Sequence, residues 1–291
     1  MSSSFRPRRS VLYMPGANAR ALEKARSLAA DGLILDLEDA VAPEAKALAR
    51  EQVCAAVAAG GYGHREVIIR VNGPDTPWGA DDLAAAIAAG PDAILLPKVS
   101  RPADLEGPAA AIAGAGKAIS LWAMMETPLA VLNAGKIAAF GPPLAALVMG
   151  TNDLARETRA RQTKDRLPML AWLSTCIAAA RAHGLDIIDG VYNDFRDEAG
   201  LAAECEQGRD LGMDGKTLIH PAQIGPCNAA FSPDDDEVAR ARAIIAAFEK
   251  PENRDKGVIT LDGRMVERLH RDMARQLVAV AEAIERKETG S

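Results

Sequence analysis

Eight short apolar segments recur along most of the chain, and their spacing constrains the fold more than any other feature. Amphipathic, Ala-rich stretches separate them, and the mean distance from one segment to the next is about 29 residues. That period is the length of one strand plus one helix and is typical of a parallel sheet. The segments are SVLYMPG from Ser10, GLILDLEDA from Gly32, EVIIRVN from Glu66, DAILLPK from Asp92, LWAMMETP from Leu121, ALVMGTND from Ala146, LDIIDGVY from Leu185 and GKTLIHP from Gly215.

Eight strand–helix units within about 220 residues predict an α/β fold of the (β/α)₈ TIM-barrel type. A doubly wound sheet is the less favoured alternative, because no Gly-rich dinucleotide turn follows the first apolar segment. We therefore expect residues 1–230 to form a barrel-shaped catalytic domain.

The pattern changes after Pro226. A helix is expected over residues 233–249, where acidic residues in the first turn suit the helix dipole. The segment VITLDGRMVE predicts a hairpin with its turn at Asp262–Gly263, and a last helix is expected over residues 268–287. We interpret residues 231–291 as a helical and hairpin extension that covers the barrel mouth as a lid or packs on a neighbouring subunit.

Composition and charge exclude several classes of partner. The net charge of −6 argues against nucleic acid as the main partner. No apolar run reaches the length of a membrane span, and none behind the basic start is long enough for a signal peptide. The four cysteines occur singly, without metal-ligand spacing, as is typical of reduced thiols. The sequence predicts a cytoplasmic protein that binds neither membranes nor nucleic acid.

Two carboxylates stand at the ends of neighbouring apolar segments. Glu126 ends LWAMMETP, and Asp153 follows 27 residues later at the end of LVMGTND. Chemistry in TIM barrels takes place at the carboxyl ends of the strands. A pair of carboxylates there is a natural site for Mg²⁺, which prefers oxygen ligands. The alternative is that each residue caps the helix that follows it.

Further charged residues are expected at the same edge of the barrel. Arg70 ends IIRVNG and can bind a carboxylate with both arms of its guanidinium, although a surface salt bridge is the alternative. Together with Glu126 and Asp153, Arg70 would bind a small 2-oxo or hydroxy acid. Glu38 and Asp39 in LDLEDA either support the metal site through bound water or cap the next helix.

Two other sets of cations have functional and structural interpretations. Lys98 in LLPKV suggests a Schiff-base aldolase, but no second cation is visible that would lower its pKa, so an electrostatic role is favoured. In PGANARALEK, Asn18 is a candidate helix N-cap. Arg20 and Lys24 on the same helix could bind the phosphates of a diphosphate ligand, or could simply form a solvated helix face.

The ordered set of motifs resembles a known family. RSVLYMPG, LDLEDA, IIRVNG, LLPKV, MMETP, MGTNDL and KTLIHPAQ resemble the CitE-like branch of the HpcH/HpaI aldolase superfamily. Members of that branch are Mg²⁺-dependent TIM barrels that act on CoA thioesters. WGADDLAAA, DGVYNDFRDEAGLAAECEQGRDLG and GRMVERLH resemble the (3S)-malyl-CoA thioesterases within it. The resemblance implies hydrolysis of (3S)-malyl-CoA, or of a close 3-hydroxyacyl-CoA, to the free acid and CoA.

Two other reactions of the same branch remain open. One is the malyl-CoA or citramalyl-CoA lyase reaction, which cleaves the substrate to acetyl-CoA and a 2-oxo acid. The other is the role of a citrate lyase β subunit, which acts on an acyl group carried by a partner protein. The family also implies a homo-oligomer, either a trimer or a dimer of trimers.

The resemblance assigns roles to residues of this chain. Glu126 and Asp153 would bind Mg²⁺, and Arg70 and Glu126 would contact the acyl group. Arg20 and Lys24 would face CoA.

The catalytic base is where the sequence departs from the lyases. Their C-terminal GxMxD pattern supplies an aspartate that acts as acid or base in a neighbouring subunit's site. Here the matching residue is Glu267, which is one methylene longer. Because a base must be placed closely against the atom it deprotonates, we expect Glu267 to activate water rather than support carbon–carbon chemistry.

Overall fold

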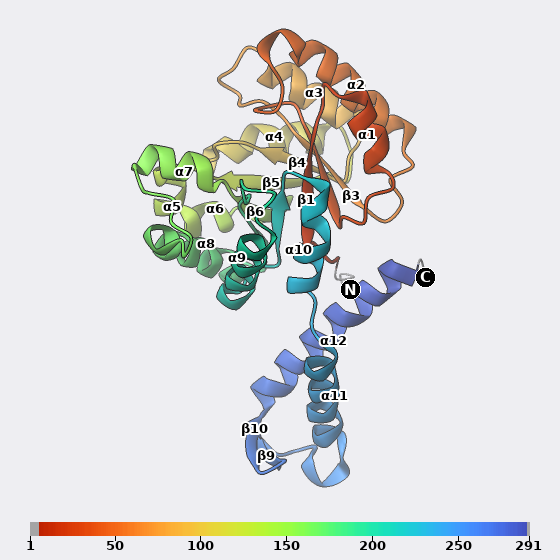
Figure 1. Cartoon of the computed structure of the whole chain (residues 1–291), viewed down its shortest axis with the longest axis vertical. Helices are drawn as coiled ribbons and strands as arrows, with labels where there is room; N and C mark the ends of the chain where they lie inside the picture. Colours follow the sequence, from red (N-terminus) through yellow and green to blue (C-terminus); the bar gives the residue numbers. More distant parts are fainter. Residues whose placement is uncertain (1–5, 290–291) are drawn as a thin grey trace. The chain divides into compact units, whose positions relative to one another are not determined.

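A computed structural model describes residues 6–289, and its centre is a closed barrel of eight parallel strands (Figure 1). Each strand pairs with the next along the chain, and the last pairs with the first. The (β/α)₈ barrel predicted from the sequence is therefore confirmed. The strands are β1 (Ser10–Pro15), β2 (Gly32–Asp36), β3 (Glu66–Arg70), β4 (Ala93–Leu96), β5 (Ser120–Met125), β6 (Leu144–Met149), β7 (Asp186–Asp189) and β8 (Gly215–Leu218).

Helices surround the barrel and connect successive strands (Figure 1). The predicted cap at the first of them is confirmed, because the Asn18 side chain accepts a hydrogen bond from the Ala21 N–H. The α-helices of the barrel are α1 (Ala19–Ala25), α2 (Lys46–Ala59), α3 (Gly79–Ala89), α4 (Ala103–Gly114), α5 (Pro128–Leu132), α6 (Ala134–Ala138), α7 (Thr151–Thr158), α8 (Leu170–Ala182), α9 (Glu198–Leu211) and α10 (Ile224–Ala230). Short 3₁₀ turns are η1 (Pro43–Ala45), η2 (Leu167–Met169) and η3 (Pro221–Gln223).

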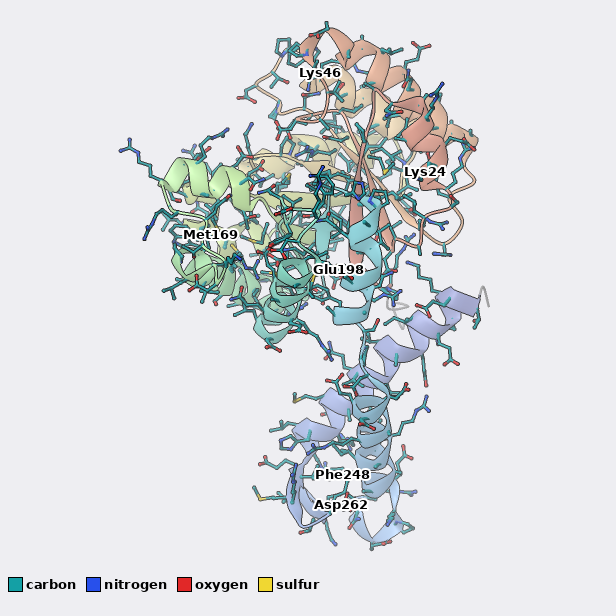
Figure 2. The ribbon with its side chains drawn as sticks, in the orientation of Figure 1. Lys24, Lys46, Met169, Glu198, Phe248 and Asp262 are labelled. Carbon is teal, nitrogen blue, oxygen red and sulfur yellow. The ribbon has the colours of Figure 1, made fainter. Side chains whose placement is uncertain are left out.

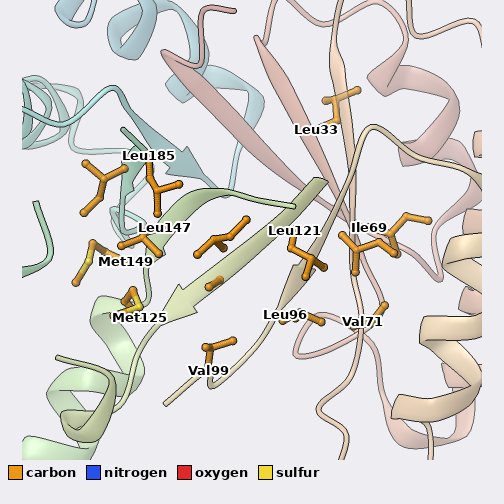
Figure 3. Close-up of a cluster of buried hydrophobic side chains, with 14 of the residues drawn as sticks. Leu33, Ile69, Val71, Leu96, Val99, Leu121, Met125, Leu147, Met149 and Leu185 are labelled. Carbon is orange, nitrogen blue, oxygen red and sulfur yellow. The ribbon is translucent and has the colours of Figure 1, made fainter. Parts of the chain in front are cut away.

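The two faces of the strands build two separate hydrophobic cores. Successive side chains on a strand point to opposite faces. On β5, Leu121 and Met125 therefore join the large outer core between strands and helices, part of which is drawn in Figure 3. Trp122 and Met124 belong to the core that fills the barrel interior. This alternation decides which residues at the strand ends face the barrel axis.

The described chain divides into two compact units. The barrel unit covers residues 8–231, and the C-terminal unit contains residues 232–289 together with residues 6 and 7. In the C-terminal unit, α11 (Asp235–Glu249) lies beside α12 (Arg268–Thr289), and the strands β9 (Val258–Leu261) and β10 (Arg264–Glu267) form an antiparallel hairpin (Figure 1).

Local sequence explains the elements of the C-terminal unit. Asp234 and Glu237 form a reciprocal capping box at the start of α11. Asp262 and Gly263 both have positive φ angles, as a tight two-residue hairpin turn requires. Phe248 packs with apolar residues of the hairpin in a small core of its own. The role of this unit as a lid or subunit contact stays a prediction.

The structure also describes the cysteines and the apolarity of the helices. All four cysteines are free thiols, and no disulfide links them. None of the helices within residues 6–289 combines the length and apolarity needed to cross a bilayer.

Candidate active site

Charged side chains collect at the carboxyl end of the barrel because of strand alternation. Ile34, Ile68 and Met124 face the barrel interior. The residues two positions further on therefore face the same side where each strand ends. These are Asp36, Arg70 and Glu126.

These residues line a cavity of about 310 Å³, here called the mouth cavity. Its wall comes from β1, β2, β3, β5, β6 and β8 and from residues that follow β2, β5, β6, β7 and β8. The lining residues are Tyr13, Asp36, Asp39, Ala40, Arg70, Met124, Glu126, Met149, Gly150, Thr151, Asn152, Asp153, Val191, Thr217 and Ile219.

The Arg70 guanidinium is buried and already engaged. Its Nε and Nη2 donate to the two oxygens of Asp36 at 2.6 and 2.7 Å. Its Nη1 lies 2.8 Å from a Glu38 oxygen, and the Tyr13 ring stacks 4.7 Å from the guanidinium carbon. Burial lowers the pKa of Arg70, but Asp36, Tyr13 and Glu38 together outweigh it and raise that pKa well above the usual value. Arg70 is thus a permanent cation in a fixed orientation.

The expectation that both arms of the Arg70 guanidinium are available to a substrate carboxylate is therefore wrong. The Nε–Nη2 edge binds Asp36 and Nη1 already contacts Glu38, so a substrate carboxylate could bind only at Nη1, beside the Glu38 oxygen. Asp36 was not singled out in the sequence. It also accepts the N–H groups of Glu38 and Ala40, which explains why a carboxylate with no exposed surface is stable there.

Glu126 is a buried carboxylate with acidic neighbours. Only 1% of its surface is exposed, and one oxygen accepts the backbone N–H of Lys98 at 2.7 Å. Burial, followed by the charges of Glu38 and Asp153, raises the pKa of Glu126 from 4.5 to about 7. Gly150 leaves room for this side chain, because a Cβ at that position would lie 2.6 Å from the Glu126 Oε2.

Asp153 lies in the first turn of α7, four residues beyond the last residue of β6. The expectation that it stands at the strand end is therefore corrected. Its position near the helix N-terminus suits a negative charge, as in the alternative reading of a helix-capping residue. Arg156 pairs with one of its oxygens at 2.5 Å. Asp153 nevertheless lines the same cavity as Glu126.

The pair Glu126 and Asp153 fits a divalent cation by its chemistry. Both are oxygen donors on one cavity, and each adds negative charge beside the other, which a cation would offset. Within residues 6–289, no group of three or more His, Cys, Asp and Glu side chains is arranged to bind a metal. A cation held by these two carboxylates would keep open positions for substrate.

The other predicted acidic residues differ in exposure. Glu38 is buried, and burial raises its pKa although Arg70 opposes the shift. One of its oxygens lies 3.5 Å from the Lys98 Nζ. Asp39 lines the mouth cavity but is largely exposed, and its nearest cation, Arg70, is 3.7 Å away.

Lys98 does not have the properties of a Schiff-base lysine. Its side chain is about half exposed (49%). Burial lowers its pKa, but the carboxylates of Glu38 and Glu126 outweigh that effect and raise it. A nucleophilic amine needs the opposite shift.

The remaining predicted residues lie away from the mouth cavity. Arg20 and Lys24 are exposed on α1 and do not line it; Lys24 is labelled in Figure 2. Glu267 belongs to the C-terminal unit, where it is the last residue of β10 and its N–H donates to the His270 Nδ1. Tyr13, which the sequence did not single out, lines the cavity beside Arg70.

Comparisons with known proteins agree with this architecture. The model of the HpcH/HpaI aldolase/citrate lyase family matches residues 9–221. A (3S)-malyl-CoA thioesterase of Cereibacter sphaeroides strain KD131 is 57% identical over 284 residues, which cover 98% of each chain. An L-malyl-CoA/β-methylmalyl-CoA lyase of the same species is 34% identical, with 96% of each chain covered.

A solved structure matches both the fold and its extent. CitE from Mycobacterium tuberculosis, in complex with magnesium, acetoacetate and coenzyme A, superposes with a TM-score of 0.77. It is 27% identical in sequence, and the match covers 95% of this chain and 98% of that one.

Proposed function

The chain belongs to the HpcH/HpaI aldolase/citrate lyase family, and we propose that it is a Mg²⁺-dependent enzyme that hydrolyses (3S)-malyl-CoA to malate and CoA. The observation that carries the proposal is the 57% identity, over 98% of both chains, to a (3S)-malyl-CoA thioesterase. The mouth cavity supports it with a fixed cation and two carboxylates on one wall.

The proposed mechanism assigns recognition of the acyl group to Arg70. Its Nη1 nitrogen, which also lies 2.8 Å from a Glu38 oxygen, donates to the distal carboxylate of the malyl group, while Asp36 holds the guanidinium in place. Glu126 and Asp153 would hold Mg²⁺ at the cavity wall, where the ion would supply Lewis-acid stabilisation of developing negative charge, worth several kcal/mol.

Hydrolysis also needs a base for water, and we assign that role to Glu267. Its carboxylate takes a proton from water as the water oxygen bonds to the thioester carbon. The carbon–sulfur bond then breaks, and the CoA sulfur takes up a proton. The products are malate and free CoA, which balances the addition of one water molecule.

We assign the CoA moiety to the side of the barrel that carries α1. Arg20 and Lys24 are exposed there, and neither forms an ion pair with another described residue. Unpaired cations on an exposed helix can bind the phosphates of CoA at little desolvation cost.

The lyase reaction is the second candidate. It is supported by the 34% identity to the L-malyl-CoA/β-methylmalyl-CoA lyase. It would give acetyl-CoA and glyoxylate from the same bound substrate. Glu267, in place of the aspartate expected from the lyase pattern, favours hydrolysis.

The two reactions are separated by their products. The purified chain is incubated with (3S)-malyl-CoA, with free thiol and glyoxylate measured in parallel. Thiol release without glyoxylate, abolished by EDTA and restored by Mg²⁺, is the expected result. Glyoxylate in equal amount to substrate consumed would establish the lyase instead. Turnover of the free CoA ester by the single chain would also exclude a need for a carrier protein.

A further inference from the structure

The ammonium group of Lys46 is buried beside the mouth cavity. Lys46 is the first residue of α2, and only 6% of its surface is exposed. Its Nζ donates to the carbonyl oxygens of Leu37 and Glu38, both at 2.8 Å, and to the Asn72 Oδ1 at 2.7 Å. The Trp78 ring lies 5.2 Å from the same nitrogen. All three N–H donors of the ammonium are therefore used (the position of Lys46 is labelled in Figure 2).

None of these three acceptors is a carboxylate. Lys46 forms no ion pair with any residue among those described, 6–289. Burial lowers the pKa of Lys46, and the nearby charges of Asp36, Glu38 and Asp82 only partly offset that effect. Burying an ammonium that contacts no carboxylate directly is costly. What distinguishes Lys46 geometrically is that its three hydrogen bonds join two separate segments of the chain.

Two of the acceptors belong to the segment that carries the acidic residues. Leu37 and Glu38 directly follow Asp36, whose carboxylate accepts two hydrogen bonds from Arg70. The side chain of Glu38 meets the remaining edge of Arg70, with 2.8 Å between the Glu38 oxygen and Nη1. The direction of that side chain depends on the peptide groups that Lys46 fixes.

The third acceptor belongs to the segment that follows β3, the strand that ends at Arg70. Asn72 follows Arg70 by two residues, and its Nδ2 also donates to the Leu37 carbonyl. Asn72 is held in turn by Asp82 of α3, at 2.5 Å between Nδ2 and Oδ2. Asp82 binds the Nε of Arg50, which lies on the same helix as Lys46, at 2.6 Å. These hydrogen bonds join the segments that follow β2 and β3 to each other and to α2 and α3.

We propose that Lys46 is a positioning residue: its ammonium ties the chain after β2 to the chain after β3, and so sets Glu38 against Arg70. In this way it fixes the edge of Arg70 that faces the substrate. The inference depends on the proposed function only where activity is measured.

The first experiment needs no substrate. Lys46→Met removes the three hydrogen bonds with little change in side-chain volume. Lys117→Met is the matched control, because the Lys117 Nζ also donates to a backbone carbonyl, that of Ala88, far from the mouth cavity. Hydrogen–deuterium exchange of the amides of residues 37–42 is expected to quicken at least tenfold in Lys46→Met. The control should exchange like the wild type. Unchanged exchange in Lys46→Met would overturn the proposal.

The second experiment measures how well the enzyme recognises the distal carboxylate of its substrate. With (3S)-malyl-CoA, Lys46→Met should lose about 10- to 100-fold in kcat/KM, as expected when a supporting contact of a site is removed. With 3-hydroxybutyryl-CoA, which lacks the distal carboxylate, the loss should be much smaller, because that substrate makes no use of Arg70. Equal losses on both substrates would point to general destabilisation and refute the positioning role.

Folding of the variant is checked by thermal unfolding. If Lys46→Met does not fold, Lys46→Gln replaces it, because its amide keeps two donors at a shorter reach. The same directions are expected for exchange and for discrimination between the two substrates. If the wild type shows no malyl-CoA hydrolysis, the proposed function fails, and the exchange measurement still decides the role of Lys46.

Discussion

At the scale of single residues, the mouth cavity contains buried charges that lower the stability of the folded chain. The clearest case is Glu126, whose pKa is raised from 4.5 to about 7 by burial and by the neighbouring carboxylates. The folded protein therefore binds the Glu126 proton more tightly than the unfolded chain does. The free energy of unfolding is therefore lowered by ionisation of Glu126. This loss is absent below about pH 4.5, grows as the pH rises to about 7, and is constant above that.

Glu126→Gln should remove this loss of stability. In EDTA at pH 8 we expect the variant to be more stable than the wild type, by up to about 3 kcal/mol. Near pH 4 the two proteins should be nearly equal, since Glu126 is then protonated in both states. Denaturant unfolding at the two pH values measures the difference. A variant that is less stable at pH 8 would contradict the electrostatic picture.

Arg70→Lys tests the guanidinium. An ammonium cannot bind both Asp36 oxygens as a planar fork does and also present a separate nitrogen to the substrate. Losing a charged hydrogen bond costs about 1.5–3 kcal/mol, so kcat/KM for malyl-CoA should fall roughly 10- to 100-fold. Steady-state kinetics measure the loss. The exposed Arg101 gives the control, Arg101→Lys, which should behave as the wild type. A change below about twofold in Arg70→Lys would place that residue outside the site.

What the sequence could reveal at this scale depended on strand periodicity. Glu126 and Arg70 were found because each ends an apolar run. Asp36 shares that alternation and could have been found in the same way, since it stands two residues after the inward-facing Ile34. The hydrogen bonds of Lys46 could not have been predicted from the sequence. Its partners include backbone carbonyls, whose position depends on the folded path of two loops.

At the scale of elements, the junction between β6 and α7 determines where Glu126 can lie. Gly150 joins the two with a φ of −100°, an angle that alanine can also adopt. The glycine is required for space: an added Cβ would overlap Glu126.

Gly150→Ala should therefore displace the Glu126 carboxylate. We expect Mg²⁺ to bind about tenfold more weakly, or worse, by analogy with other losses of support at metal sites. The control is Gly135→Ala in α6, where an added Cβ meets no atom within 4 Å. Isothermal titration with Mg²⁺ compares the two variants. Unchanged affinity in Gly150→Ala would argue that Glu126 is not a metal ligand.

Periodicity predicted the order of the elements better than their internal breaks. All eight strands begin at or near the predicted positions. The connection after β5, however, consists of two short helices, α5 and α6, that meet at Asn133. The Asn133 side chain donates to the Ser100 carbonyl, 33 residues earlier in the chain. A break stabilised by such a distant contact leaves no local signal in the sequence.

At the scale of the whole molecule, the proposed catalytic groups are divided between two units. Arg70, Glu126 and Asp153 belong to the barrel unit, whereas Glu267 belongs to the C-terminal unit. We propose that the enzyme is a trimer or a dimer of trimers in which the C-terminal unit of one subunit completes the site of another. The sequence predicted the helix, hairpin and helix of that unit, because each is set by local caps and turns.

Glu267→Gln removes the proposed base and keeps the size of the side chain. Hydrolysis should fall by roughly two to four orders of magnitude, the range for a lost general base, while the KM changes little. Glu267→Asp should raise glyoxylate release relative to free thiol, because it restores the aspartate expected from the lyase pattern. Product analysis of both variants tests these outcomes. An unimpaired Glu267→Gln enzyme would remove this residue from the mechanism.

Mixed oligomers show which subunit supplies the base. Asp153→Ala chains lack a metal ligand but carry an intact Glu267, and Glu267→Gln chains have the opposite defect. If the base comes from a neighbouring subunit, a site is intact when a Glu267→Gln barrel meets the C-terminal unit of an Asp153→Ala chain. Random mixing in equal amounts makes about one quarter of the sites intact in a symmetric oligomer. Activity recovered to that level, from two inactive proteins, is the expected result. No recovery in oligomers verified to be mixed would mean that each C-terminal unit serves its own barrel.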